Sequence, residues 1–140
     1  AIQTAGDITT TNDNITFTRA VSITDGHSVL FSTGAGIGDV LFVATLDGTT
    51  NYSEDVTVSA GTGNITFGNP TAAVGATVPL RDLIANSTGI TLFSSTVLAR
   101  SITTNSGGTT ILNGNVTTTQ TQTYNDALRI DATLTLQTTS

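Results

Sequence analysis

The chain has 140 residues, a net charge of −6 at pH 7 and a charged fraction of 10%, against about 25% in a typical soluble domain. It contains no Lys, and its four basic residues are Arg19, Arg81, Arg100 and Arg129. Nucleic acids and anionic membrane surfaces are bound through clustered basic side chains, so this composition argues against both partners. The absence of Cys excludes disulfides and cysteine metal sites.

The composition favours strands over helices. Thr, which is β-branched and suits a pleated surface, is the commonest residue, whereas Glu54 is the only Glu. We therefore expect an all-β chain with little or no helix. No stretch resembles a signal peptide or a membrane-spanning helix, so we expect no membrane insertion and place any export signal outside this sequence.

Short stretches of alternating polar and apolar residues, bounded by Gly, Asn or Asp, predict ten or more strands. In chain order the clearest are residues 14–18, 21–24, 29–31, 40–43, 55–59, 64–67 and 132–137. Turns are predicted between them at residues 25–26, 34–38, 47–48, 61–63, 69–70, 107–108 and 113–114.

Residues 78–86 are an exception to this alternation. Leu80, Leu83 and Ile84 have helical spacing, and Pro79 stands where a helix could begin. We expect a single helical turn or a short loop there.

Internal similarity indicates a repeat protein. Residues 14–17 (Asn-Ile-Thr-Phe) recur as residues 64–67, and a weaker third copy contains Tyr124. Residues 7–11 similarly match residues 115–119. The last residues, 134–140, also read as continuous repeat with residues 1–7. We therefore expect residues 1–140 to form one repeat segment, about one unit of a longer tandem array.

Residues 56–68, 108–119 and 122–126 resemble the long repeats of filamentous-haemagglutinin-like giant surface proteins of Gram-negative bacteria. The resemblance runs from about residue 7 to the end of the chain and is weakest at residues 78–95. It implies a right-handed parallel β-helix, or β-solenoid, on the cell surface or in the extracellular space. Such proteins serve as adhesins, biofilm-matrix components or toxin carriers. An antiparallel, pilin-like β-sandwich is the alternative fold.

A β-solenoid explains the composition, because stacked rungs share an apolar interior and place like side chains above one another. Stacked charges would repel, whereas stacked Thr or Asn would not. Gly and Asn are expected at corners because they tolerate positive φ. The expected inward ladder consists of Ile15, Phe17, Val21, Ile23, Val56, Val58, Ile65 and Phe67.

Catalytic groups are sparse. His27, the only His, lies between Asp25 and Ser28, but neighbours in one turn rarely form a catalytic triad, so we expect an exposed turn residue. Paired carboxylates could hydrolyse glycosides, and the candidate pairs are Glu54 with Asp55 and Asp126 with Asp131. We interpret these four as solvated turn carboxylates.

Calcium is the metal that the Asp- and Asn-rich turns would suit best, through residues 11–14 or 47–55. Neither segment has an established calcium-loop spacing, so we expect Asx turns there and predict no cofactor. Residues 34–38 lack the spacing of a phosphate-binding loop and are expected to form a plain loop. Five Asn-x-Ser/Thr sequons begin at Asn14, Asn51, Asn64, Asn86 and Asn115.

These observations favour a structural or adhesive repeat segment of a bacterial surface or secreted fibrous protein, and not an enzyme. Its expected partners are neighbouring repeats or further copies of the chain, with glycan or host-surface contacts beyond them. The alternative is a filament subunit joined end to end by β-strand addition, with candidate assembly ends at Ile2, Ile8, Leu134 and Leu136. A carbohydrate-active β-helix enzyme is the least favoured hypothesis.

Overall fold

The computed structural model describes residues 1–68 and 72–140, so the turn expected at residues 69–70 lies outside the described residues. The described residues form strands and loops without a helix. They therefore contain no helix that could span a membrane. The strands are β1 (Ile2–Thr4), β2 (Ile8–Thr9), β3 (Ile15–Phe17), β4 (Val21–Ile23), β5 (Ser28–Ser32), β6 (Val40–Phe42), β7 (Leu46–Asp47), β8 (Asp55–Ser59), β9 (Ile65–Phe67), β10 (Leu80–Asn86), β11 (Ile90–Phe93), β12 (Val97–Thr104), β13 (Thr109–Leu112), β14 (Val116–Thr118), β15 (Gln122–Tyr124), β16 (Ala127–Ile130) and β17 (Leu136–Thr138).

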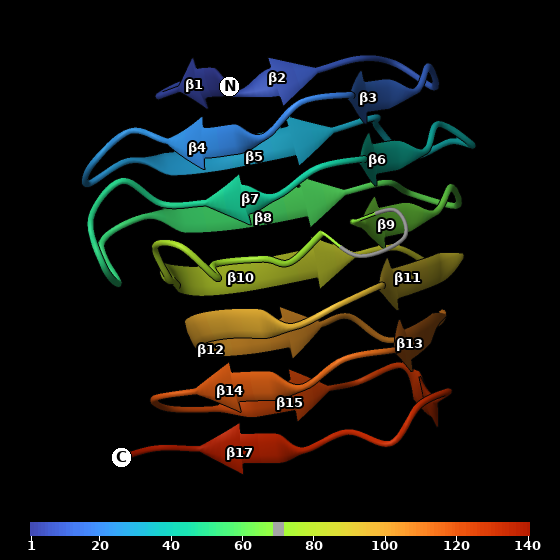
Figure 1. Cartoon of the computed structure of the whole chain (residues 1–140). Helices are drawn as coiled ribbons and strands as arrows, with labels where there is room; N and C mark the ends of the chain where they lie inside the picture. Colours follow the sequence, from blue (N-terminus) through green and yellow to red (C-terminus); the bar gives the residue numbers. More distant parts are fainter. Residues whose placement is uncertain (69–71) are drawn as a thin grey trace.

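Every strand pairing among the described residues is parallel, and the strands stack into three faces (Figure 1). Face A contains β1, β4, β7, the start of β12, β14 and β17, with Val74 bridging β7 to β12. Face B contains β2, β5, β8, β10, the end of β12 and β15. Face C contains β3, β6, β9, β11, β13 and β16. The expected all-β parallel solenoid is confirmed, and the antiparallel sandwich is excluded.

The rungs differ in length because the corner loops differ. Asn14 and Asp39, which occupy equivalent positions on successive rungs, are 25 residues apart. Asn115 and Thr135, equivalent positions near the C-terminal end, are only 20 residues apart. A varying rung length blurs the sequence period, although every rung crosses the faces in the same order.

The interior consists of columns of side chains that run through successive rungs. On face C, Phe17, Phe42, Phe67 and Phe93 stack with ring centroids 5.0, 5.4 and 4.8 Å apart, within the range of offset aromatic stacking. On face A the column is Ile2, Val21, Leu46, Val74, Val97, Val116 and Leu136. The eight residues expected to face inward are all buried, at 6% exposure or less.

Only some of the segments that are similar in sequence occupy equivalent positions in the solenoid. Residues 14–17 and 64–67 do occupy equivalent positions, because β3 and β9 lie two rungs apart on face C. The proposed third copy is wrong, because Tyr124 belongs to β15 on face B. Residues 7–11 and 115–119 are not equivalent either, since β2 lies on face B and β14 on face A.

The apparent continuity of the two chain ends does not match the rung spacing. Both β1 and β17 belong to face A, and Ile2 and Leu136 lie in the same column. Two strands of one face are separated by a full turn of chain, for example from Val97 to Val116. A direct peptide link between the two ends would leave too few residues for such a turn.

Residues 78–86 form neither a helical turn nor a loop, because residues 80–86 are the seven-residue strand β10. Its start pairs with face A, at Leu80 and Ala99, and its remainder with face B, at Leu83 and Val56. The strand bends around the corner at Arg81 and Asp82, which both point away from the core. This bend separates the buried Leu80 and Leu83 by three residues and so imitates helical spacing.

The interior becomes more polar toward the C-terminal rungs, which the sequence patterns did not indicate. Thr91, Thr104, Thr110 and Thr118 are fully buried. The hydroxyls of Thr91 and Thr104 have no hydrogen-bond partner among the described residues. Such groups weaken a core, because burial removes water without providing a replacement partner.

Candidate functional site

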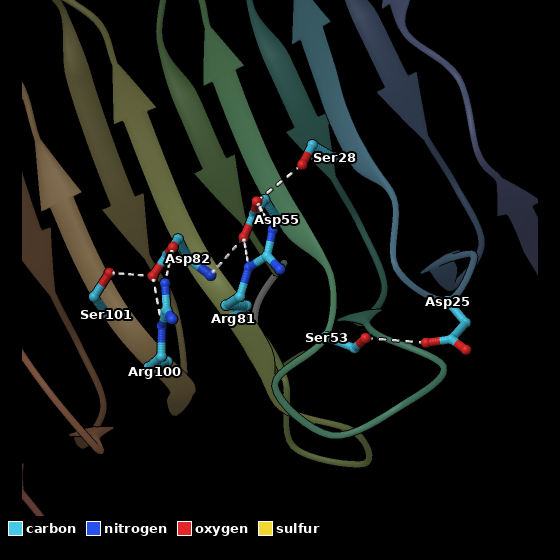
Figure 2. A network of polar contacts seen from close by, with 8 residues as sticks. All are labelled: Asp25, Ser28, Ser53, Asp55, Arg81, Asp82, Arg100 and Ser101. Carbon is cyan, nitrogen blue, oxygen red and sulfur yellow. Dashed lines mark hydrogen bonds and ion pairs between the residues drawn. The ribbon is translucent and has the colours of Figure 1, made fainter.

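The most extensive polar cluster lies on the outer side of face B, near the corner with face A (Figure 2). Strand register stacks Ser28, Asp55, Asp82 and Ser101 at one position on four successive rungs. Two carboxylates thus lie one above the other, an arrangement that repulsion would normally disfavour. The drawn cluster comprises Asp25, Ser28, Ser53, Asp55, Arg81, Asp82, Arg100 and Ser101.

Two arginines neutralise this stack. Each lies one residue before the aspartate position of its own rung and reaches back to the aspartate of the preceding rung (Figure 2). Arg81 Nε donates to Asp55 Oδ1 at 2.7 Å, and Arg100 Nε donates to Asp82 Oδ1 at 3.2 Å. A second guanidinium nitrogen completes each pair. Arginine suits this role because its planar fork matches a carboxylate at two points.

Asp55 is the most heavily hydrogen-bonded carboxylate of the cluster. Besides Arg81 it accepts the Ser28 hydroxyl at 2.8 Å and the Asp82 backbone N–H at 3.2 Å. The hydrogen bond from Arg81 is the main cause that lowers the pKa of Asp55; partial burial opposes it, and Ser28 adds to the lowering. Asp55 therefore stays ionised and acts as an electrostatic clamp between rungs.

Glu54 is not the solvated turn carboxylate that we expected. Adjacent residues of a strand point to opposite sides, so Asp55 faces outward while the Glu54 side chain is fully buried. Its Oε1 accepts the Thr49 hydroxyl at 3.2 Å and the Thr50 backbone N–H at 3.0 Å. Its Oε2 has no partner among the described residues. Glu54 therefore holds the β7–β8 loop and has a partner set distinct from that of Asp55.

The second carboxylate pair is also divided. Asp126, expected to be solvated, is buried and accepts the Gly108 N–H at 2.9 Å and the Thr110 hydroxyl at 3.0 Å. Asp131 forms an exposed ion pair with Arg129, at 2.7 Å. A glycoside hydrolase needs two carboxylates facing one bond, whereas each of these two is engaged in its own structural contact.

His27 has no triad geometry. It is exposed, and its Nδ1 lies 2.8 Å from the backbone carbonyl oxygen of Asp25 instead of its carboxylate. The Ser28 hydroxyl donates to Asp55 and not to the imidazole. The side chains of Asp25, His27 and Ser28 thus form no hydrogen bond with one another.

Several oxygens of the segments considered for calcium accept hydrogen bonds within the protein. Asn14 Oδ1 accepts the Asp39 N–H at 2.8 Å, and Asp39 Oδ1 accepts the Asn64 N–H at 2.6 Å, on successive rungs. Asp47 Oδ1 accepts the Thr77 N–H at 3.0 Å. Across residues 1–68 and 72–140, no three acidic or His side chains gather as a metal site. These side chains serve as hydrogen-bond links between rungs.

The glycines at the corner between faces B and C form a column of close backbone contacts. A Cβ on Gly63 would lie 2.2 Å from the Gly38 carbonyl oxygen, and one on Gly108 would lie 2.5 Å from the Gly89 oxygen. None of these four has a positive φ. These four glycines are therefore required for space, whereas Gly34, Gly61 and Gly107 at the same corner have the positive φ that we expected of corner glycines. Residues 34–38 form a loop at this corner.

The two ends of the stack expose apolar side chains. Of the candidate assembly residues, Ile2 and Leu136 are 37% and 41% exposed, while Ile8 and Leu134 are partly buried against the core. The sequence patterns missed Leu128 and Ile130 of β16, which are exposed at the same end as Leu136. Tyr124, also in the last rungs, is more enclosed, and burial raises its pKa to about 12.

The part of the chain that the structure describes contains no surface pocket. A scan against models of protein families found no match to this chain, and searches of the curated proteins and of the solved structures found none either. The functional proposal therefore depends on the geometry of the solenoid.

Proposed function

We propose that this chain is a rigid structural repeat segment of a bacterial surface or secreted fibrous protein, which acts as a spacer and presents its outward loops for adhesion. The observation that carries the proposal is the unbroken apolar column of face A, which ends in exposed Ile2 at one end and exposed Leu136 at the other. Such a column continues naturally into further rungs. The extracellular setting is supported by the resemblance of the repeats.

A role without catalysis is supported by the contacts of the reactive side chains. The candidate acids Asp55, Asp126 and Asp131 each bind a guanidinium, a hydroxyl or a backbone N–H. Glu54 secures a loop from inside. Each of the four is thus engaged in a structural contact, which suits a spacer.

A filament subunit is the second candidate, favoured by the edges of β1 and β17. Among the described residues β1 pairs with β4 alone and β17 with β14 alone, so a second copy could add a strand to the other edge of either. A head-to-tail contact of this type does not close and so produces fibres.

Electron microscopy and size-exclusion chromatography over a concentration series test both functions. A monodisperse monomer at every concentration would support the spacer, whereas long fibres with a regular axial repeat would replace it with the filament subunit. A chain without the circular-dichroism signature of β-strands would contradict both.

Two variants of β17 identify the contact if fibres form. Leu136→Lys places a charge in the apolar column and should abolish assembly. Gln137→Lys, its outward neighbour on the same strand, should leave assembly intact. Equal effects of the two variants would show that β17 is not the joining strand.

A further inference from the structure

The structure separates the five Asn-x-Ser/Thr sequons by what their amides contact. The Oδ1 atoms of Asn14, Asn64 and Asn115 accept backbone N–H groups of the next rung, at 2.8, 2.9 and 2.8 Å. Asn86 is half-buried within the paired strand β10. The side-chain amides of the first three thus link successive rungs, and the backbone of Asn86 is part of a sheet.

Asn51 differs from the other four. It is exposed in a turn closed by a hydrogen bond from Ser53 N to the Thr50 oxygen, at 3.2 Å. Among the described residues its side chain forms no hydrogen bond. Tyr52, the middle residue of this sequon, has a φ of 59° and is 39% exposed. A positive φ is uncommon for a residue with a bulky side chain and marks a tight turn.

The base of this turn is held firmly, so the tip is presented in one orientation. The buried carboxylate of Glu54 accepts hydrogen bonds from Thr49 and Thr50 on one side of the turn. On the other side, the Tyr52 N–H donates to the Pro79 oxygen at 2.8 Å. The Ser53 hydroxyl remains on the exposed surface, where it donates to Asp25 Oδ1 at 3.0 Å.

We propose that Asn51 is an N-glycosylation site and the preferred one of the five sequons in the folded chain. In this reaction Asn51 Nδ2 forms a bond to the anomeric carbon of a sugar carried by a glycosyl phosphate donor. The bond between that carbon and the phosphate breaks, the phosphate-bearing group leaves, and Nδ2 loses one proton to a base of the transferase. An acceptor amide must leave its protein contacts to enter a transferase, and within residues 1–68 and 72–140 the Asn51 amide has no hydrogen bond to break. The inference does not depend on the proposed spacer function.

The test compares the folded chain with five short peptides, one for each sequon. Each is incubated with a soluble asparagine glucosyltransferase and UDP-glucose, and occupancy at each Asn is followed by mass spectrometry. The peptide rates correct for the preference of the enzyme for the residues around each Asn. We expect the corrected rate at Asn51 to exceed those at Asn14, Asn64 and Asn115 by about tenfold, since each of those must first lose a hydrogen bond.

Two variants assign the product to the proposed sequon. Asn51→Gln removes the acceptor, and Ser53→Ala removes the hydroxyl of the sequon while keeping the acceptor. Both variants should therefore abolish the rapid glucosylation at residue 51. Equal corrected rates at all sites would overturn the proposal. So would an Asn51 that is modified in the peptide but not in the folded chain.

Discussion

Successive rungs approach one another closely at single residues of the corner between faces B and C. Gly38, Gly63, Gly89 and Gly108 stack there, and each of the last three leaves too little room for a Cβ against the preceding rung. A methyl group at this position would meet backbone, which cannot move aside as a flexible side chain can. The column therefore sets the spacing of the rungs at this corner.

Gly63→Ala should destabilise the solenoid strongly. Its Cβ would lie 2.2 Å from the Gly38 oxygen, and forced overpacking costs about 1–3 kcal/mol or more. The loss is measured as a lower midpoint of urea unfolding. Gly6→Ala is the matched control, because its Cβ would meet nothing within 4 Å. Similar midpoints for the two variants would show that the corner accommodates a side chain.

Parallel strands in register place side chains of successive rungs directly above one another. Where two of these outward side chains carry the same charge, neighbouring strands must supply the opposite charge. β8 and β10 place Asp55 above Asp82, and the strands that follow supply Arg81 and Arg100 in the adjacent position. Each aspartate is thus paired with an arginine of the next rung, at a position offset by one residue along the strand. This pattern reconciles a low charge content with two stacked carboxylates.

Arg81→Gln should lower stability at neutral pH, and its effect should vanish in acid. The folded-state pKa of Asp55 lies below its ordinary value of 3.8, so its contribution is present above that value and is lost as the pH falls through the lowered one. The free energy of unfolding, measured from pH 7 to pH 2, should show the two proteins beginning to converge below pH 3.8 and meeting below the lowered pKa of Asp55.

Arg129→Gln is the control for this pH dependence, because Arg129 pairs with Asp131 within one exposed strand end. It should change stability less than Arg81→Gln at pH 7. Added salt should weaken the effect of Arg81→Gln by screening the ion pair. A difference between wild type and Arg81→Gln that persists unchanged at low pH would assign the loss to packing instead of charge.

Over the whole molecule, stability should decline toward the C-terminal rungs. A solenoid is stabilised by contacts between neighbouring rungs, so each rung depends on its own core residues. The N-terminal and central rungs contain the stacked Phe column, whereas the C-terminal rungs contain buried Thr, and every residue of β16 and β17 is exposed.

Amide hydrogen exchange should reveal this gradient. We expect the slowest exchange in β8 and β10, which lie in the middle of the stack, and fast exchange in β16 and β17. Thr104→Val should slow exchange in the adjoining C-terminal rungs, because it removes a buried hydroxyl without a partner. Thr103→Val, on the outward side of the same strand, is the control. Uniform exchange along the chain would contradict the gradient.

Features that depend on neighbouring residues could be predicted from the amino-acid sequence alone. Alternation of polar and apolar residues gave the all-β class, and it put Ile65 and Phe67 on one side of a strand, where both are buried. The recurrence of one four-residue pattern at residues 14–17 and 64–67 located two strands that share face C. Each of these follows from the two-residue period of a strand, which is legible within a few positions.

The tertiary structure alone fixes the features that depend on the next rung, which lies about 18 to 28 residues away because the corner loops differ in length. It made Leu80 and Leu83 parts of a bent strand and enclosed Glu54 and Asp126 as structural acids. It also made glycines into spacers at one corner and gave the Asn14 amide a partner on the next rung, whereas the Asn51 amide has none among the described residues. The physical reason is that a solenoid forms its contacts across rungs, so a side chain's neighbours are set by register and not by adjacent sequence.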